Sequence, residues 1–128
     1  MILSRRETFG QILGSSAALL LLQGCKHMDE LTDSAALYGL IGEIKALPGQ
    51  RDALIAALLA GSADMPGNLT YMVSKDAGNP DSIWIVEVWR DSAAHQASLQ
   101  LPQVQEAIRI GRPLMAGFGT RAEVVPAV

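Results

Sequence analysis

Two side chains that can exchange protons lie close together in the sequence. Glu87 lies in an apolar run that ends at Trp89, and His95 follows a few residues later. A carboxylate in such surroundings can remove a proton from a substrate or orient its hydroxyl group, and histidine changes charge near neutral pH. We therefore take Glu87 and His95 as candidate catalytic residues. The alternatives are a structural carboxylate paired with an arginine or a backbone amide, and a surface or capping histidine.

Aromatic and amide side chains nearby are candidates for binding a flat substrate. Trp84 and Trp89 can stack on an aromatic ring, although core or dimer packing also explains them. Their separation is odd, so a strand turns them to opposite faces and they cannot both line one pocket. Asn68 and Tyr71 can donate hydrogen bonds to a substrate oxygen. Turn chemistry is the alternative for Asn68, and half-buried packing is the alternative for Tyr71.

Other kinds of functional site find little support in the sequence. No group of His, Cys, Asp and Glu has the spacing of metal ligands, and no Ser–His–Asp arrangement or phosphate-binding glycine loop is visible. The formal net charge is −3 and the Lys and Arg residues form no cluster, which argues against a nucleic-acid partner. We expect no metal site and no contact with nucleic acid.

Four strands and the helices between them must position these residues. Alternating side chains predict strands at residues 37–47, 68–75, 83–89 and 120–125. The turn formers at residues 76–81 join the second and third strands in an antiparallel hairpin. Gly117-Phe118-Gly119 is expected to end the helical segment before the fourth strand.

Apolar residues at helical spacing predict the helices. Residues 50–62 carry one apolar stripe that includes Leu54 and Leu58. Asp91 or Ser92 can cap a second helix that runs to about residue 100. Pro102 suits the first turn of a further helix, which Arg112-Pro113 disrupts.

The order of these elements is β, α, β, β, α, β, which predicts a ferredoxin-like α+β sandwich at residues 37–126. Its helices would cover one face of the sheet. The other face carries too many apolar groups to remain in contact with water, and a second copy can cover it. We therefore expect a homodimer with sheet against sheet, a dimeric α+β barrel.

Residues 1–25 have the three parts of an export signal: a basic pair, an apolar run too short to span a membrane, and small residues before Cys25. Leu22-Gln23-Gly24-Cys25 resembles the lipobox of bacterial lipoproteins, in which the cysteine receives a lipid, and the basic pair resembles a twin-arginine signal. We expect a membrane-anchored lipoprotein on the periplasmic or outer face of a bacterial membrane, with residues 26–36 as a tether. If Met28 is the true start, the protein is cytoplasmic.

Several short segments along the predicted domain form a recognisable ordered set. They are Pro66-Gly67-Asn68-Leu69-Thr70-Tyr71, Asn79-Pro80-Asp81, Trp84, Glu87-Val88-Trp89, Ala93-Ala94-His95-Gln96-Ala97-Ser98-Leu99, Leu101-Pro102-Gln103-Val104 and Arg112-Pro113-Leu114. This set resembles the antibiotic biosynthesis monooxygenase (ABM) family of dimeric α+β barrels over essentially the whole predicted domain.

The resemblance implies an activity as well as a fold. Characterised members of the family include small oxygenases that hydroxylate quinols or polycyclic phenols without metal or flavin; others cleave haem, and many have no demonstrated activity. We therefore expect a cofactor-independent monooxygenase that oxidises a small quinol or phenolic aromatic with dioxygen. The alternative is a non-catalytic dimeric module that binds a small apolar ligand or acts in stress. Haem handling is disfavoured, because no second histidine follows His95.

Overall fold

A computed structural model describes residues 37–127. They cover the domain expected from the sequence. The expected export signal, Cys25 and the tether at residues 26–36 lie outside the described residues. Within the described part, no helix is both long enough and apolar enough to cross a membrane.

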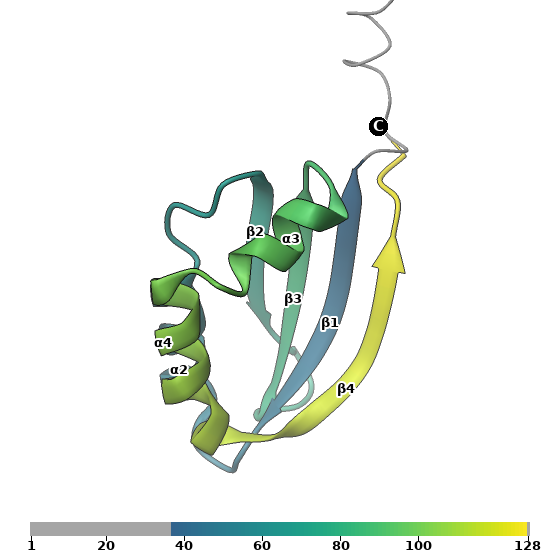
Figure 1. The fold of residues 1–128 in the computed structure, drawn as a ribbon. Helices are drawn as coiled ribbons and strands as arrows, with labels where there is room; N and C mark the ends of the chain where they lie inside the picture. The colour runs from purple at the N-terminus through teal and green to yellow at the C-terminus, as the bar shows by residue number, and fades with distance from the viewer. Residues whose placement is uncertain (1–36, 128) are drawn as a thin grey trace, which may run out of the picture. The chain divides into compact units, whose positions relative to one another are not determined.

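Four antiparallel strands form the sheet of this domain. They are β1 (Tyr38–Ala46), β2 (Asn68–Lys75), β3 (Ser82–Trp89) and β4 (Met115–Val124), in the spatial order β2-β3-β1-β4. Gly39 in β1 lies opposite Val124 in β4, so the chain enters and leaves the domain at one end of the sheet (Figure 1).

The helices gather on one side of this sheet (Figure 1). They are α2 (Arg51–Gly61), α3 (Ser92–Ser98) and α4 (Pro102–Gly111), and a short 3-10 helix, η2 (Arg112–Leu114), follows α4. The expected cap of α3 is present, because the Asp91 carboxylate accepts a hydrogen bond of 2.7 Å from the Ala94 amide. The βαββαβ order with one helical layer confirms the predicted ferredoxin-like α+β fold.

The start of β4 differs from the expectation. The strand begins at Met115, so the segment from Gly117 to Gly119 lies inside it. The register between β1 and β4 shifts between Gly42 and Ile44, which marks a bulge that bends β4 (Figure 1). A side chain at Gly119 would displace the Glu43 carboxylate, which accepts a hydrogen bond from the Ser82 hydroxyl. The glycines therefore mark a bend within the strand.

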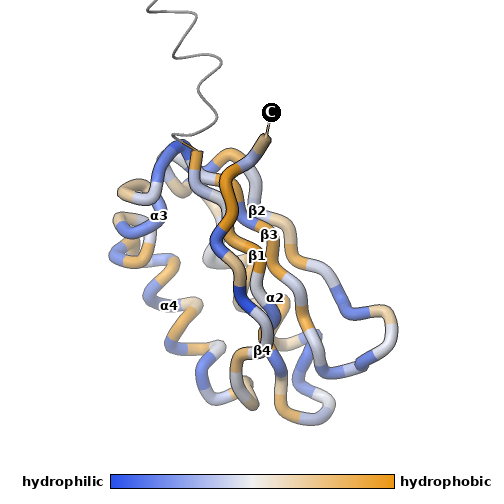
Figure 2. The backbone as a smooth tube through the Cα atoms, turned by 90° about the vertical axis from the view of Figure 1, so that its right-hand side faces the viewer, coloured by the Kyte–Doolittle hydropathy of each residue, from blue (hydrophilic) through white to orange (hydrophobic). Residues whose placement is uncertain are grey.

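The alternation of side chains along β3 gives the sheet two different faces. Ile83, Ile85 and Trp89 point toward the helices and are 0%, 7% and 1% exposed. Trp84 lies on the opposite face, where its indole N–H donates a 2.8 Å hydrogen bond to the Asp76 carboxylate and lowers the pKa of that group. The expectation that the two tryptophans occupy opposite faces is confirmed. Figure 2 shows how apolar residues recur along the strands.

Replacing Leu54 with alanine tests the contribution of α2 to the core. Leu54 is 1% exposed and packs with Ile83 and Ile85, so its truncation leaves a void. We expect the free energy of unfolding to fall by about 2–5 kcal/mol. Leu59 on the same helix is 52% exposed, and Leu59→Ala should cost less than about 0.5 kcal/mol. Urea denaturation followed by circular dichroism measures both, and equal losses would contradict the assignment of the core.

Candidate active site

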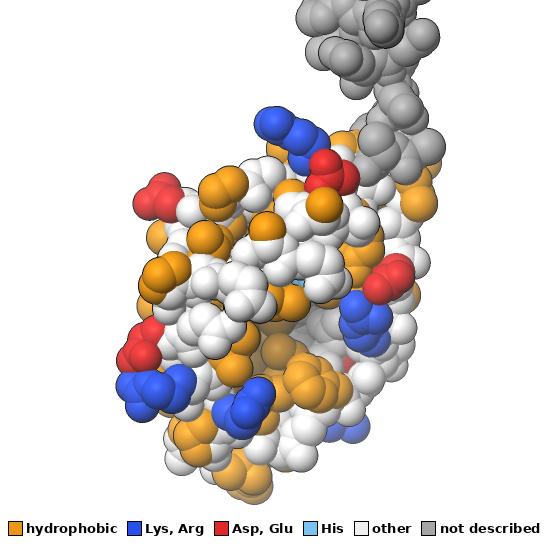
Figure 3. Space-filling model, viewed as in Figure 1, with side chains coloured by type: hydrophobic (Ala, Val, Ile, Leu, Met, Phe, Trp, Pro, Cys, Tyr) orange, Lys and Arg blue, Asp and Glu red, His pale blue; other side chains and the backbone are white. Residues whose placement is uncertain are grey.

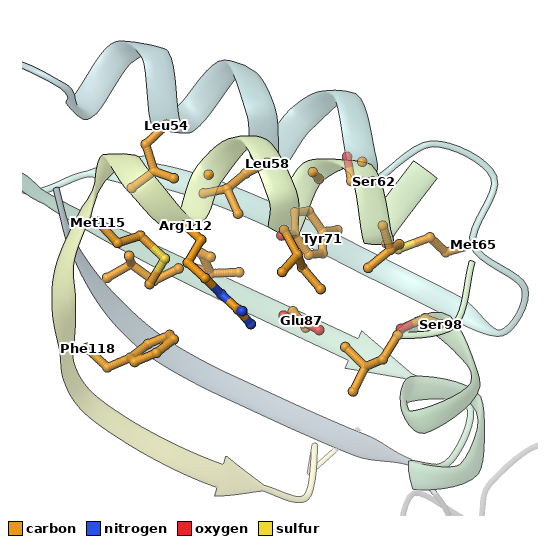
Figure 4. A pocket seen from close by; sticks show the side chains of 18 of the residues that line it. Leu54, Leu58, Ser62, Met65, Tyr71, Glu87, Ser98, Arg112, Met115 and Phe118 are labelled. Carbon is orange, nitrogen blue, oxygen red and sulfur yellow. The ribbon is translucent and has the colours of Figure 1, made fainter. Parts of the chain in front are cut away.

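A cavity of about 480 Å³ lies between the helices and the inner face of the sheet. Most of its wall is apolar, with contributions from Leu54, Leu58, Met65, Ile85, Met115 and Phe118 (Figure 4). Figure 3 shows a hollow on this side of the molecule, bordered mainly by hydrophobic side chains. A volume of this size is typical of sites that hold a small organic molecule.

The close packing of α2 on α4 forms the roof of the cavity. A Cβ atom at Gly61 would come within 2.5 Å of the Ala107 Cβ atom, and one at Gly111 within 3.1 Å of Leu54. The two helices can therefore approach each other closely only because these positions lack side chains. All four residues also line the cavity, so the same contact shapes its wall.

Glu87 is the carboxylate inside this apolar cavity. Its side chain is 12% exposed, and its Oε2 atom accepts a 2.7 Å hydrogen bond from the indole Nε1–H of Trp89. The two residues are two positions apart on β3, so the strand turns both toward the helices. The bond satisfies a buried indole donor and fixes the orientation of the carboxylate.

His95 approaches the same carboxylate from α3. Its Nε2 atom lies 3.8 Å from the Glu87 Oε2 atom, which is within range for an ion pair but beyond hydrogen-bond distance. The ring is packed against Tyr38 and Trp89, with centroid separations of 5.1 and 5.5 Å. His95 is 9% exposed, and its Nδ1 atom has no hydrogen-bond partner among the described residues. The Nδ1 atom is thus buried against the protein, and Nε2 is the nitrogen that faces Glu87.

Tyr71 adds a phenol to this group. It lies on β2 directly opposite Glu87 and lines the cavity. Burial, and secondly the negative charge of Glu87, raise the pKa of Tyr71 well above its usual range. Its hydroxyl group therefore stays protonated and can donate a hydrogen bond to an oxygen atom in the cavity.

The cavity thus brings together four of the residues singled out from the sequence: Glu87, His95, Tyr71 and Trp89. Asn68 and Trp84, the other two residues expected to bind substrate, do not line this cavity. The Asn68 side-chain amide donates hydrogen bonds to the carbonyl oxygens of Thr70 and Val88, at a register shift in β2. Trp84 lies on the outer face of the sheet and binds Asp76.

Arg112 and Phe118 also line the cavity and were missed as site residues. In the sequence, Arg112-Pro113 indicates only the end of a helix. Its spacing from Val104 and Ile108 continues the stripe that faces the cavity, and this signal was available in the sequence. The sequence predicts Phe118 at the end of the helical segment, and only the early start of β4 places it opposite Ile44 on the inner face.

The described residues show no group of three or more His, Cys, Asp or Glu side chains arranged to hold a metal ion. The polar groups of the cavity are instead proton donors and acceptors. Glu87 can accept a proton, His95 can accept or relay one, and Tyr71 can donate a hydrogen bond. Such a set suits the removal of a proton from a bound organic molecule.

These features define a ferredoxin-like α+β protein with an acid–base group in an apolar cavity. The family model of the antibiotic biosynthesis monooxygenases matches residues 37–110, and the chain belongs to this family. No curated protein matches the chain.

Solved structures support the same assignment. A Chloroflexus aurantiacus protein assigned to the antibiotic biosynthesis monooxygenases is 54% identical, with a TM-score of 0.71 over 72% of this chain and 94% of that one. A Pseudomonas aeruginosa protein is 24% identical, with a TM-score of 0.64 over 73% and 96% of the two chains. A Caulobacter crescentus protein is 17% identical, with a TM-score of 0.67 over 80% and 99%. The last two show the fold alone, and together with the family the first supports a general monooxygenase-like role.

The bond between Glu87 and Trp89 can be tested without an activity assay. Glu87→Ala leaves the buried indole N–H without an acceptor, whereas Glu87→Gln keeps an oxygen in its place. We expect the alanine variant to be less stable than the glutamine variant by about 1–3 kcal/mol, the cost of an unsatisfied buried donor. Urea titration followed by tryptophan fluorescence gives the difference, and equal stabilities would argue against the bond.

Proposed function

We propose that the protein is a cofactor-independent monooxygenase that oxidises a small quinol or phenolic aromatic with dioxygen. The observation that carries the proposal is the approach of His95 to Glu87 inside an apolar cavity. One oxygen atom enters the ring and the other leaves as water. A quinol becomes a hydroxyquinone and supplies all four electrons.

The part of the protein in this reaction is to move protons and exclude water. Glu87, assisted by His95, removes a proton from the substrate hydroxyl, because the anion transfers an electron to dioxygen more readily than the neutral ring. Tyr71 remains protonated and donates a hydrogen bond to the oxygen atom on which negative charge develops. The apolar wall holds the ring and keeps bulk water from the intermediate.

The proposed location fits a lipid-soluble substrate. An anchor at Cys25 would hold the domain at a membrane surface, where quinols reside. This part of the proposal depends on the sequence pattern of residues 1–25.

Oxygen uptake with a panel of hydroquinones tests the proposed chemistry. The wild-type chain should consume oxygen faster than the uncatalysed reaction, and Glu87→Gln should slow it by about 10²–10⁴-fold, the usual contribution of a general base. His95→Ala should slow it as well. Glu106→Gln is a matched control, because this exposed carboxylate on α4 pairs with Arg109 outside the cavity. Its rate should equal that of the wild type.

Failure of every quinol to raise uptake above the uncatalysed rate would reject the oxygenase. The apolar wall then favours the second candidate function, a module that binds a small apolar ligand without turnover. Native mass spectrometry of protein purified from its host would reveal such a ligand retained unaltered.

We also propose that the outer face of the sheet forms a homodimer. Ile41, Val86 and Met72 are aligned across this face in register, and Ile41 and Met72 are 37% and 51% exposed. Such a row of apolar side chains is stabilised when a second sheet covers it.

Val86→Lys places a charge at the centre of this row and should convert the dimer into a monomer. Ala60→Lys, on the exposed side of α2, is the control and should leave the dimer intact. Sedimentation velocity of the full chain measures both. A monomeric wild-type chain would overturn the proposed dimer.

A further inference from the structure

Arg112 places a positive charge at the mouth of the cavity. It is the first residue of η2, directly after α4, and it lines both the cavity and an adjoining hollow that also includes Arg109. Figure 4 shows its guanidinium group extending into the cavity between Phe118 and Glu87. The side chain is exposed, so a ligand can reach it from the solvent side.

Among residues 37–127, the side chains of Arg112 and Arg90 have no hydrogen-bond or ion-pair partner, and of these two only Arg112 lines the cavity. Arg51 donates hydrogen bonds to backbone carbonyl oxygens, Arg109 pairs with Glu106, and Arg121 pairs with Glu123. No hydrogen bond or ion pair joins Arg112 to a described residue, although the chain as a whole carries a formal net charge of −3. Its charge is therefore available to a ligand in the cavity.

The negative and the positive charge of the cavity lie at different places along its wall. Glu87 provides negative charge on the floor, beside His95, and Arg112 provides positive charge nearer the mouth (Figure 4). An anionic group is repelled by the carboxylate and attracted by the guanidinium, which can hold a carboxylate through two parallel hydrogen bonds. A neutral ring can bind the apolar wall but gains no ion pair with Arg112.

We infer that the substrate is an aromatic acid, and this inference rests on the proposed function. Arg112 binds its ring carboxylate, and its reactive hydroxyl lies at Glu87 and His95. The binding of the carboxylate at one end orients the ring. The hydroxyl group at the other end is then within reach of the groups that remove its proton. Arg112 is thus a positioning and specificity-determining residue.

Two ligands that differ only in the carboxylate test this inference. Isothermal titration calorimetry of the full chain with 6-hydroxy-2-naphthoate and with 2-naphthol compares the same ring with and without the charge, and neither ligand is a quinol that oxidises during the experiment. We expect the wild type to prefer the acid by about tenfold, which corresponds to about 1.4 kcal/mol.

Three variants test whether the Arg112 side chain causes the preference for the acid. Arg112→Gln should abolish it and leave the affinity for 2-naphthol unchanged, whereas Arg112→Lys should retain part of it because it keeps the charge without the planar fork. Arg109→Gln removes the same charge from the neighbouring α4 outside the cavity and should leave the preference intact.

Each contrary result has a distinct meaning. Equal binding of the two ligands by the wild type, or a preference that persists in Arg112→Gln, overturns the inference while the cavity still accepts an aromatic ring. Binding of neither ligand overturns both the inference and the proposed function. A preference that depends on Arg112, together with no oxygen uptake, supports the ligand class and rejects the oxygenase.

Discussion

Burying a carboxylate in an apolar cavity is costly unless its oxygen atoms find partners, and this constraint dominates the domain. Glu87 is 12% exposed and accepts a hydrogen bond from the indole of Trp89. The bond requires both residues on the same face of β3. The orientation of the candidate base therefore depends on the inner face of the sheet and on the packing of Trp89.

The rest of the site follows from that orientation. Trp89 also forms one side of the aromatic pocket that holds the His95 ring, so the residue that fixes Glu87 also fixes its neighbour. The charge of Glu87 acts across to β2, where it helps to keep the Tyr71 phenol protonated. The side chains of Trp89, His95 and Tyr71, from three different elements, thus all interact with the Glu87 carboxylate.

The parts of this arrangement that the sequence could predict depend on local periodicity. Alternation in β3 places Glu87 and Trp89 on one face and Trp84 on the other, and the cap at Asp91 correctly locates α3. Periodicity also places Arg112 on the stripe of α4, although Pro113 indicates that the helix ends there.

What the sequence could not supply is the approach of segments that are far apart in the chain. The 3.8 Å between His95 and Glu87 depends on how α3 packs on the sheet, and no local pattern encodes it. The early start of β4 depends on its pairing with β1, where Met115 lies opposite Ala46, so the glycines that were expected to end the helical segment belong to a bent strand. The Asn68 side chain likewise forms its hydrogen bond at the register shift of β2, which no local pattern encodes.

The pairing of Gly39 with Val124 has a practical consequence for the whole molecule. Both ends of the domain meet at the pole where Tyr38 packs on His95, so a fluorophore or fused protein attached directly to residue 37 or residue 127 crowds the candidate site. The hairpin loop at residues 76–81 lies at the opposite pole, next to the end of β1 where Lys45 pairs with Ser82. A label inserted there lies at the end of the sheet away from Tyr38 and His95.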